Sequence, residues 1–547
     1  MGTVREVLRV PDVRRIELGW ALTVVGELAG TVALIVYAYD KGGAALVAAY
    51  AVAGTTAAIG IGFFLAAVGD RVRRGRLLRV LVGLRAGLMA LAAVVAALDG
   101  PAAAVVSLAA ASFAFQGTYR PLQAAILPWL VRTPAELTAS NVASGMAENA
   151  GTLAGPALAG VLVALAGAPA AIAMSAGFFV LATLALRLLA VPPHPTAARH
   201  HRVHVVREVA EGISGFVRLP PPGGIAMLLI VQTLLRGALT VLIAVLAVDV
   251  LALGEAAVGW LTAAIGVGGL VGGFIAAAVV RITRLGRTFV VGLLLWGLPM
   301  VALALFPLPV VAYLALVLVG IGNAIEDAAA FTMIARLAPP KLVGRVLAAT
   351  ELLALTGIAL GSFVAPLLIA TIEVEGTLAV LGGAVAVLAL ANLMRFRRLD
   401  RTMPAPGPEL ELVRGLPMFA HLSLAVSELV AGELRPRSYQ PGAVVVREGD
   451  TGDEFHLVLA GSAAVTVHGK TRPSLGRGDC FGEIALLRDV PRTATITATE
   501  SLRTLALGRT EFLTAISGNA LSAAVAEAVV AERLTADPPV TDRPQEG

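Results

Sequence analysis

Long apolar runs separated by short polar segments fill the chain from its beginning to about residue 400. A helix needs about 20 apolar residues to cross a bilayer. The hydropathy pattern predicts twelve such helices, over residues 16–38, 44–67, 77–98, 102–126, 139–166, 169–191, 224–248, 256–280, 288–306, 309–334, 346–372 and 376–394. The chain is therefore expected to be a mainly α membrane protein.

Two proline-rich breaks divide the chain. The first, Pro192 to Gly223, separates six predicted spans from six, and the second, Met403 to Pro408, is a linker. A weak repeat, Arg71–Arg76 after the second span and Arg281–Arg287 after the eighth, supports duplication, which is common in transporters. The expected parts are an N-terminal six-helix half at 1–192, a central cytoplasmic loop at 193–223, a C-terminal six-helix half at 224–400, a linker at 401–409, a soluble domain at 410–535 and a disordered tail at 536–547.

Beyond the linker the apolar residues alternate over short stretches, which is the strand pattern. Strands are predicted at 443–447, 454–459, 463–468 and 493–498, and helices at 410–413, 422–434 and 511–534. Glycines separate the strands. We expect a cytoplasmic β-roll with flanking helices.

Composition and charge agree with a membrane location. The chain is 57% hydrophobic and only 14% charged, against about 25% charged residues in soluble domains. Basic residues gather in alternate loops, so the positive-inside rule predicts that both termini and the soluble domain lie in the cytoplasm. An even number of spans requires both termini on the same side, which agrees with this prediction. We expect a multi-pass plasma membrane protein with the lipid bilayer as a partner. The net charge of +5 comes from these loops and does not indicate nucleic acid.

Cysteine and histidine usage gives no metal site. Cys480 is the only cysteine, which excludes an intrachain disulfide and a multi-cysteine metal centre. It is read as a small buried residue rather than a redox switch. His200, His201 and His204 lie among arginines without a carboxylate or thiol ligand pattern, so a solvated loop is expected.

Two segments of the apolar region carry a family resemblance. Gly69–Arg76 resembles the loop between helices 2 and 3 of the major facilitator superfamily, with extra residues between Asp70–Arg71 and Gly75–Arg76. Gly151–Gly160 looks like that family's antiporter signature, in which small residues let helices approach and proline kinks a helix. The resemblance implies a cytoplasmic latch and a helix 5 signature. The latch residues are Asp70, Arg71, Arg74 and Arg76, and the signature residues are Gly151, Gly155, Pro156 and Gly160.

Simpler interpretations of both segments remain open: a positive-inside loop, and generic packing of small residues. Together with Arg120–Pro128, Glu136–Asn141 and Pro339–Arg345, however, the pattern resembles the drug and siderophore exporter branch of the family.

Charged residues at membrane depth are the candidate transport sites, because each costs about 2.5–3.5 kcal/mol to insert. Glu27 lies 12 residues beyond Arg15, near mid-bilayer. The other candidates are Arg120, Glu148, Arg236, Glu326 and Asp327. We expect Glu27 to be the main proton or cationic-substrate site, since exporters of this family often carry an acid in helix 1. The alternative is a structural ion pair, for instance Arg120 with Glu148 or with Glu27.

The run Phe481–Thr495 has the form of a phosphate pocket. A turn at Gly482 opens a short helix whose N–H groups can face a phosphate, Glu483 can accept from a ribose hydroxyl, and Arg492 can make a two-pronged contact with phosphate. With Arg414–Phe419 and Pro441–Phe455, the domain resembles the cyclic-nucleotide-binding domain. The resemblance assigns Gly482, Glu483, Ile484, Ala485, Arg492 and Thr493 to the pocket.

In relatives a threonine at the Thr493 position also reaches guanine, so both cAMP and cGMP are candidate ligands. A degenerate roll that binds nothing is the alternative.

The expected function is a secondary active transporter, a proton-coupled exporter of a small amphipathic molecule, regulated by cAMP or cGMP. A transport-inactive, membrane-anchored cyclic-nucleotide receptor is the alternative from another class. A cyclic-nucleotide-gated channel predicts six spans, a carbonyl-lined filter and an arginine-repeat helix, and the sequence displays none of these. The chain has no nucleotide-hydrolysis loop, nucleophile elbow or zinc motif, so neither an enzyme nor a cofactor is expected.

Overall fold

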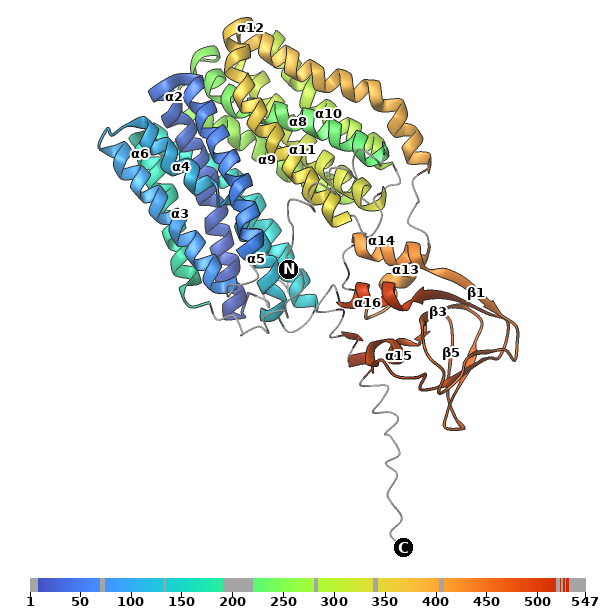
Figure 1. The fold of residues 1–547 in the computed structure, drawn as a ribbon. Helices are drawn as coiled ribbons and strands as arrows, with labels where there is room; N and C mark the ends of the chain where they lie inside the picture. The colour runs from blue at the N-terminus through green and yellow to red at the C-terminus, as the bar shows by residue number, and fades with distance from the viewer. Residues whose placement is uncertain are drawn as a thin grey trace. The chain divides into compact units, whose positions relative to one another are not determined.

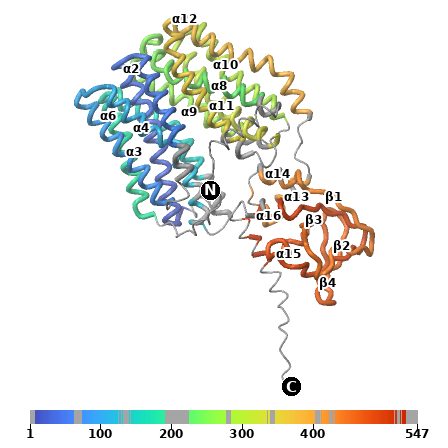
Figure 2. The backbone as a smooth tube through the Cα atoms, in the orientation of Figure 1, coloured from blue at the N-terminus to red at the C-terminus, as the bar shows by residue number. Residues whose placement is uncertain are grey.

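The computed structural model describes residues 8–68, 74–131, 134–189, 220–279, 284–337, 343–402, 408–420, 422, 424–517, 522, 525, 526 and 528–530. The chain forms two compact units, Met1–Met403 and Pro404–Gly547 (Figures 1 and 2). Asp70 and Arg71 of the predicted latch, most of the predicted central loop and the predicted tail lie outside the described residues.

The first unit is helical. Its elements are α2 (Pro11–Val68), α3 (Arg74–Ala97), α4 (Ala102–Phe113), the short 3-10 turn η1 (Gln116–Thr118), α5 (Tyr119–Leu130), α6 (Pro134–Arg187), α8 (Pro220–Val245), the π-helical turn η2 (Leu246–Val250), α9 (Ala256–Val279), α10 (Leu285–Leu305), α11 (Pro309–Leu337) and α12 (Val343–Thr402). Helices α2, α3, α4 and α6 contact one another, as do α8, α10, α11 and α12, while α9 packs on α11 and α6 (Figure 1).

Within the described residues, nine helices are long and apolar enough to cross a membrane. Three of the long helices contain residues with non-helical backbone angles: α2 at Gly42 and Gly43, α6 at Gly167, and α12 at Glu373. One of the nine candidate spans, Ala102–Gln123, is interrupted within the predicted span 102–126, because α4 ends at Phe113 and η1 precedes α5. The Thr118 hydroxyl donates to the Phe115 carbonyl at 2.7 Å and closes this turn.

Small residues bring α6 close to two other helices. A Cβ at Gly155 would lie 2.8 Å from the carbonyl oxygen of Val25 in α2, and one at Gly160 would lie 2.9 Å from that of Ala256 in α9. Such approaches between backbones are possible only without a side chain. The predicted signature segment therefore lies where α6 packs against α2 and α9.

The second unit is a β-roll with helices. It contains α13 (Pro408–Gly415), α14 (Leu424–Glu433), β1 (Arg435–Tyr439), β2 (Val444–Val446), β3 (Glu454–Ala460), β4 (Ala463–Val467), β5 (Lys470–Leu475), β6 (Cys480–Phe481), α15 (Glu483–Arg488), β7 (Thr495–Ala498), β8 (Leu502–Gly508) and α16 (Arg509–Ser517). The strands pair antiparallel in two sheets, in the orders β1-β8-β3-β6 and β2-β7-β4-β5.

Two apolar clusters hold the roll together. Phe419, Phe455 and Phe512 pack with ring centroids 4.9–5.9 Å apart between the helices and the first sheet. Val458 and Ile496 belong to a second cluster with members from both sheets. The four predicted strands are confirmed as β2, β3, β4 and β7, with small changes at their ends. The sequence prediction missed β1, β5, β6 and β8.

Candidate functional site

The predicted pocket is centred on the turn between β6 and α15. Gly482 precedes α15 with φ of +95°, in the left-handed region that favours glycine. β6 pairs with the central strand β3, which fixes the start of the turn. Glu483, the first residue of α15, is only 1% exposed. The carboxylate is thus inside the roll, next to the turn.

Arg492 returns to this turn from the loop after α15. Its backbone is fixed on both sides, since its N–H donates to the Asp450 carbonyl at 2.8 Å and its carbonyl accepts from Gly449 at 2.9 Å. Its guanidinium is buried and donates to the carbonyl oxygens of Glu454 at 2.7 Å and Gly482 at 3.3 Å. Burial lowers the pKa of Arg492, while nearby carboxylates, Asp453 first, oppose that shift.

Two glycines make room for this guanidinium. A Cβ at Gly452 would lie 2.8 Å from Nε of Arg492, and one at Gly482 would collide with Nη1. Ala485 completes this cradle, since it is buried and a Cβ at Gly452 would lie 2.9 Å from its Cβ. A planar cation held at the wall of a roll by neutral carbonyls is suited to meet a phosphate.

His456 on β3 lies beneath the pocket. Its ring stacks on Phe481 at 4.8 Å, and its Nδ1 lies 3.4 Å from the Thr504 hydroxyl. Burial lowers the pKa of His456 to about 4, although Glu454 opposes the shift. Burial acts to raise the pKa of Glu454, but the hydrogen bond from Arg437 at 2.6 Å and the nearby positive charges together outweigh it, so that this pKa is lowered. His456 is therefore neutral at neutral pH.

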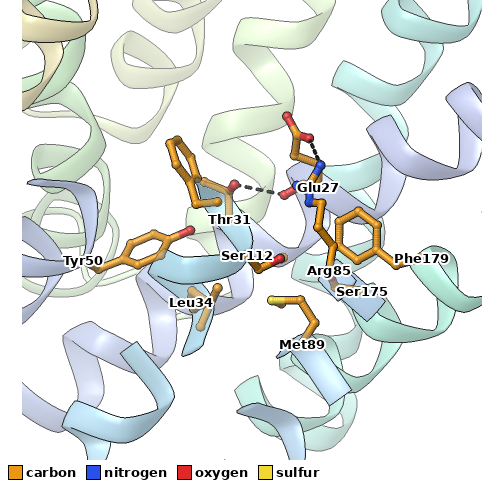
Figure 3. Close-up of a pocket in the computed structure, with 12 residues that line it drawn as sticks. Glu27, Thr31, Leu34, Tyr50, Arg85, Met89, Ser112, Ser175 and Phe179 are labelled. Atoms are coloured by element: carbon orange, nitrogen blue, oxygen red, sulfur yellow. Dashed lines mark hydrogen bonds and ion pairs between the residues drawn. The ribbon is translucent and has the colours of Figure 1, made fainter. Parts of the chain in front are cut away.

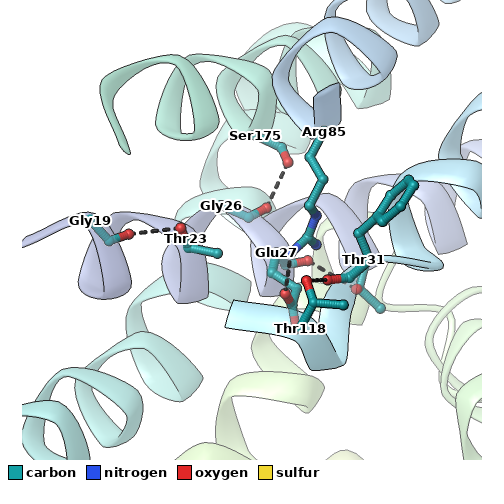
Figure 4. A network of polar contacts seen from close by, with 9 residues as sticks. Gly19, Thr23, Gly26, Glu27, Thr31, Arg85, Thr118 and Ser175 are labelled. Carbon is teal, nitrogen blue, oxygen red and sulfur yellow. Dashed lines mark hydrogen bonds and ion pairs between the residues drawn. The ribbon is translucent and has the colours of Figure 1, made fainter. Parts of the chain in front are cut away.

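A second polar site lies inside the helical unit. Oε2 of Glu27 in α2 accepts from Nη1 of Arg85 in α3 at 2.9 Å (Figures 3 and 4). The guanidinium lies 4.4 Å from the ring centroid of Phe179 (Figure 3). Both side chains line a cavity of about 20 Å³, enough for about one water molecule. The cavity also has the polar lining residues Thr31, Tyr50, Ser112 and Ser175.

Arg120 does not pair with Glu27, in contrast to one expected alternative. It donates to Gln123 at 3.2 Å and lies over the ring of Trp20 at 5.8 Å. Gln123 in turn donates to Ser144, whose hydroxyl bonds both oxygens of the buried Glu17 at 2.7 and 2.9 Å. Glu148 is exposed on α6 and acts electrostatically on Glu27.

A third group of charges comes from α8, α11 and α12. Arg236 lies within electrostatic reach of Glu326, Asp327 and Glu351. Glu326 is fully buried, and neither carboxylate oxygen has a hydrogen-bond partner within the part of the chain that the structure describes. Asp327 accepts from Asn323 at 3.1 Å. Three of the predicted transport residues thus lie in one cluster, and Glu351 was not predicted.

Part of each unit matches a known family. Residues 225–447 match the Major Facilitator Superfamily, and residues 436–519 match the cyclic nucleotide-binding domain. The first match runs beyond Met403, the end of the helical unit, so its last part falls in the second unit.

The chain joins a major facilitator superfamily region to a cyclic nucleotide-binding domain.

Similar proteins match the second unit. Over 102 residues the chain is 38% identical to a cAMP-dependent protein kinase regulatory subunit of Yarrowia lipolytica, covering 18% of this chain and 27% of the relative. Over 109 residues it is 37% identical to a cGMP-dependent protein kinase of Eimeria tenella, covering 20% and 11%. The catabolite activator protein of Thermus thermophilus is 31% identical over 22% of this chain and 59% of its own, with a TM-score of 0.21.

The chain thus spans about a quarter or less of the two kinase-related proteins. These findings support a cyclic nucleotide as the regulatory ligand of the second unit, and neither matched family is an enzyme family.

In the cyclic nucleotide-binding domain, the structure brings Gly482, Glu483, Ala485 and Arg492 together, while Ile484 and Thr493 are half-buried beside them. Gly452 was missed, although the glycines around it signalled a tight turn. Arg85 was also missed in the helical unit, although it is an arginine inside the predicted span 77–98. Of the predicted latch, Arg74 begins α3 and Arg76 is exposed.

Proposed function

We propose that this chain is a secondary active transporter of the plasma membrane whose activity is regulated by cAMP or cGMP. The observation that carries the proposal is the geometry of Arg492. A buried guanidinium that donates to two carbonyl oxygens, with glycine at 452 and 482 on either side, is a prepared site for an anion. The identity of the kinase-related proteins to this unit supports a cyclic nucleotide as that anion.

Different pocket residues are expected to bind different parts of the nucleotide. We assign the phosphate to Arg492 and to the turn at Gly482, and the ribose hydroxyl to the Glu483 carboxylate. We also assign a hydroxyl contact to Thr493, which keeps cGMP a candidate beside cAMP. Isothermal titration of the purified chain with each nucleotide tests this assignment. Arg492→Ala should abolish binding, while Arg477→Ala, an exposed arginine of the same unit, should leave it unchanged.

For the membrane unit we propose twelve spans in two six-helix halves. Dividing α2, α6 and α12 at their non-helical residues turns nine candidate helices into twelve. The alternation of basic loops then favours cytoplasmic termini and a cytoplasmic nucleotide pocket. Accessibility of single cysteines, introduced at Lys41 and Arg284 after removing Cys480, to an impermeant thiol reagent would test this orientation.

We further propose that Glu27 exchanges a proton during export of a small amphipathic molecule. The support is its position in α2, its ion pair with Arg85 and the water-sized cavity beside it. Arg85 gives the charged carboxylate a partner, and breaking that pair is a discrete event to which transport can couple. Proteoliposomes with a pH gradient and candidate drugs or siderophores, with and without cAMP or cGMP, test transport and regulation together. Glu27→Gln should remove the pH dependence.

A transport-inactive receptor is the second candidate, and one observation favours it. The Glu27–Arg85 pair is almost fully buried, with side chains 14% and 5% exposed, as a purely structural bond would be. In that case Glu27→Gln would destabilise the protein and no substrate would move under any gradient. Nucleotide binding would still be lost in Arg492→Ala.

A further inference from the structure

One carboxylate at the end of α12 is hydrogen-bonded to the beginning of α10. Asp400, in the last turn of α12, accepts from the backbone N–H of Gly286 at 2.6 Å and of Arg287 at 3.2 Å. Its side chain is 3% exposed, and Nε of Arg287 lies 3.6 Å from the same carboxylate. These are N–H groups of the first turn of a helix, which have no partner within the helix, so Asp400 satisfies and anchors the start of α10.

Apolar packing makes this junction rigid. Phe396, one turn before Asp400, packs on Phe289 of α10 at 5.3 Å, and both rings are buried. A Cβ at Gly286 would lie 2.7 Å from the Phe396 carbonyl, so the backbones of the two helices touch here. The two helices therefore move together at this point.

The end of α6 is held differently. There Arg15 and Arg79 donate to the carbonyls of Leu188 and Arg187 at 2.9 and 3.0 Å, and both contacts are exposed to solvent. Long, exposed side chains on single carbonyls make a looser connection than one buried carboxylate on two amides. The tighter connection belongs to the helix that leads to the nucleotide-binding domain.

The linker to that domain is short. α12 ends at Thr402 and α13 begins at Pro408, so five residues separate the helices. Such a segment spans at most about 20 Å when extended. A displacement of the second unit beyond that reach must pull on the last turn of α12, which carries Asp400.

Helix α10 in turn contacts Glu326 of α11, whose carboxylate is buried. A Cβ at Gly292 would lie 2.7 Å from Cβ of Glu326, so α10 and α11 touch at this residue. We propose that Asp400 is the positioning residue through which nucleotide binding moves α10 against Glu326. This inference rests on the proposed regulation by cyclic nucleotide. The path runs from Asp400 to the first turn of α10, along α10 to Gly292, and from Gly292 to Glu326, and its first and last steps are direct contacts.

The test needs no transport substrate. In a Cys480→Ala background, spin labels at Val80→Cys on α3 and Val291→Cys on α10, both exposed positions, report the distance between these helices by pulsed electron resonance. Adding saturating cAMP, or cGMP, should shift the distance distribution in the labelled parent. Asp400→Ala should lose the shift, although its nucleotide Kd stays within about twofold of the parent, because Asp400 belongs to the helical unit and none of the pocket residues does.

Asp400→Asn keeps one acceptor and the shape of the side chain, so it should retain part of the shift even if Asp400→Ala folds poorly. Arg401→Ala, the exposed neighbour, should keep all of it. Two results overturn the inference: a full shift in Asp400→Ala, or no shift in a parent that binds nucleotide. Neither result contradicts the proposal that the chain binds a cyclic nucleotide. A parent that binds neither nucleotide overturns the proposed regulation as well, and titration alone reveals that case.

Discussion

Two buried arginines, one in each unit, are held in opposite ways. Arg85 in the helical unit bonds a carboxylate at 2.9 Å and stacks on Phe179. Arg492 in the roll donates to the carbonyl oxygens of Glu454 and Gly482, which are dipoles and carry no full charge. Both guanidiniums have lost most of their water. Only Arg85 has gained a carboxylate at hydrogen-bonding distance in return.

The difference separates a closed site from an open one. A buried ion pair is complete, so a ligand must break it before it can compete for either partner. A guanidinium held by carbonyls can accept an anion by exchanging weak acceptors for a stronger one. The comparison thus predicts that changes at Arg85 affect mainly stability, whereas changes at Arg492 affect mainly nucleotide affinity.

The largest expected effect comes from removing one partner of the buried Glu27–Arg85 ion pair. Glu27→Ala leaves the Arg85 guanidinium buried without its carboxylate and should destabilise the protein by about 3–5 kcal/mol. Replacing both, as Glu27→Leu with Arg85→Met, should recover most of that loss, because an apolar pair of similar volume carries no desolvation penalty. Thermal unfolding of the full chain in detergent measures both. If the double variant melts as low as Glu27→Ala, the pair is not the reason for the loss.

The site around Arg492 is best tested by a substitution that keeps the positive charge of this side chain and changes its shape. Arg492→Lys retains a cation but loses the planar fork, so one charge-assisted hydrogen bond to phosphate is lost, worth about 1.5–3 kcal/mol or roughly tenfold to a hundredfold in Kd. Titration with cAMP and cGMP gives the value. The melting temperature without nucleotide should change little. An unchanged Kd would mean that phosphate does not bind at Arg492.

Acid should weaken the roll through His456, whose environment includes Arg492. Its pKa is lowered to about 4 by burial, against about 6.5 in an unfolded chain. A depressed pKa contributes stability that is complete above pH 6.5 and is lost as the pH falls toward 4. At pH 5 the loss is about 2 kcal/mol.

Hydrogen exchange of the β3 and β8 amides in the full chain at pH 7 and pH 5, corrected for intrinsic rates, measures this loss. His456→Gln should remove it. The matched control is His468→Gln, because the His468 side chain is 72% exposed. Equal acid sensitivity in the His456 variant would assign the effect to other groups.

The sequence predicted the pocket around Arg492 better than the Glu27–Arg85 ion pair, for a physical reason. The pocket residues from Gly482 to Arg492 are close in the chain, and a positive φ leaves a visible glycine. Arg85 meets Glu27 across 58 residues, and neither spacing nor periodicity reveals which buried charges pair. β1 and β5 were missed because mostly exposed strands such as Arg435–Tyr439 carry no apolar alternation. The non-helical residues of α2, α6 and α12, at Gly42–Gly43, Gly167 and Glu373, lie in the gaps that the apolar runs predict between spans, because a polar or small residue interrupts each run there.

The smallest expected effect isolates one contact of the open site. Gly482 and Gly478 have nearly the same backbone angle, φ of +95° and +94°, but a Cβ at Gly482 would collide with Arg492 whereas one at Gly478 has open space within 4 Å. Both Gly→Ala variants carry the same left-handed strain, about 1–2 kcal/mol. Only Gly482→Ala must also push the guanidinium from its place. The nucleotide Kd should therefore rise several-fold more in Gly482→Ala, by about 1 kcal/mol. This variant should also lose more stability, because its Cβ would lie 2.8 Å from the carbonyl oxygen of Glu454. Equal nucleotide affinities in the two variants would show that the Arg492 guanidinium can move without weakening binding. Arg85 and Arg492 would then differ only in the groups that they bond.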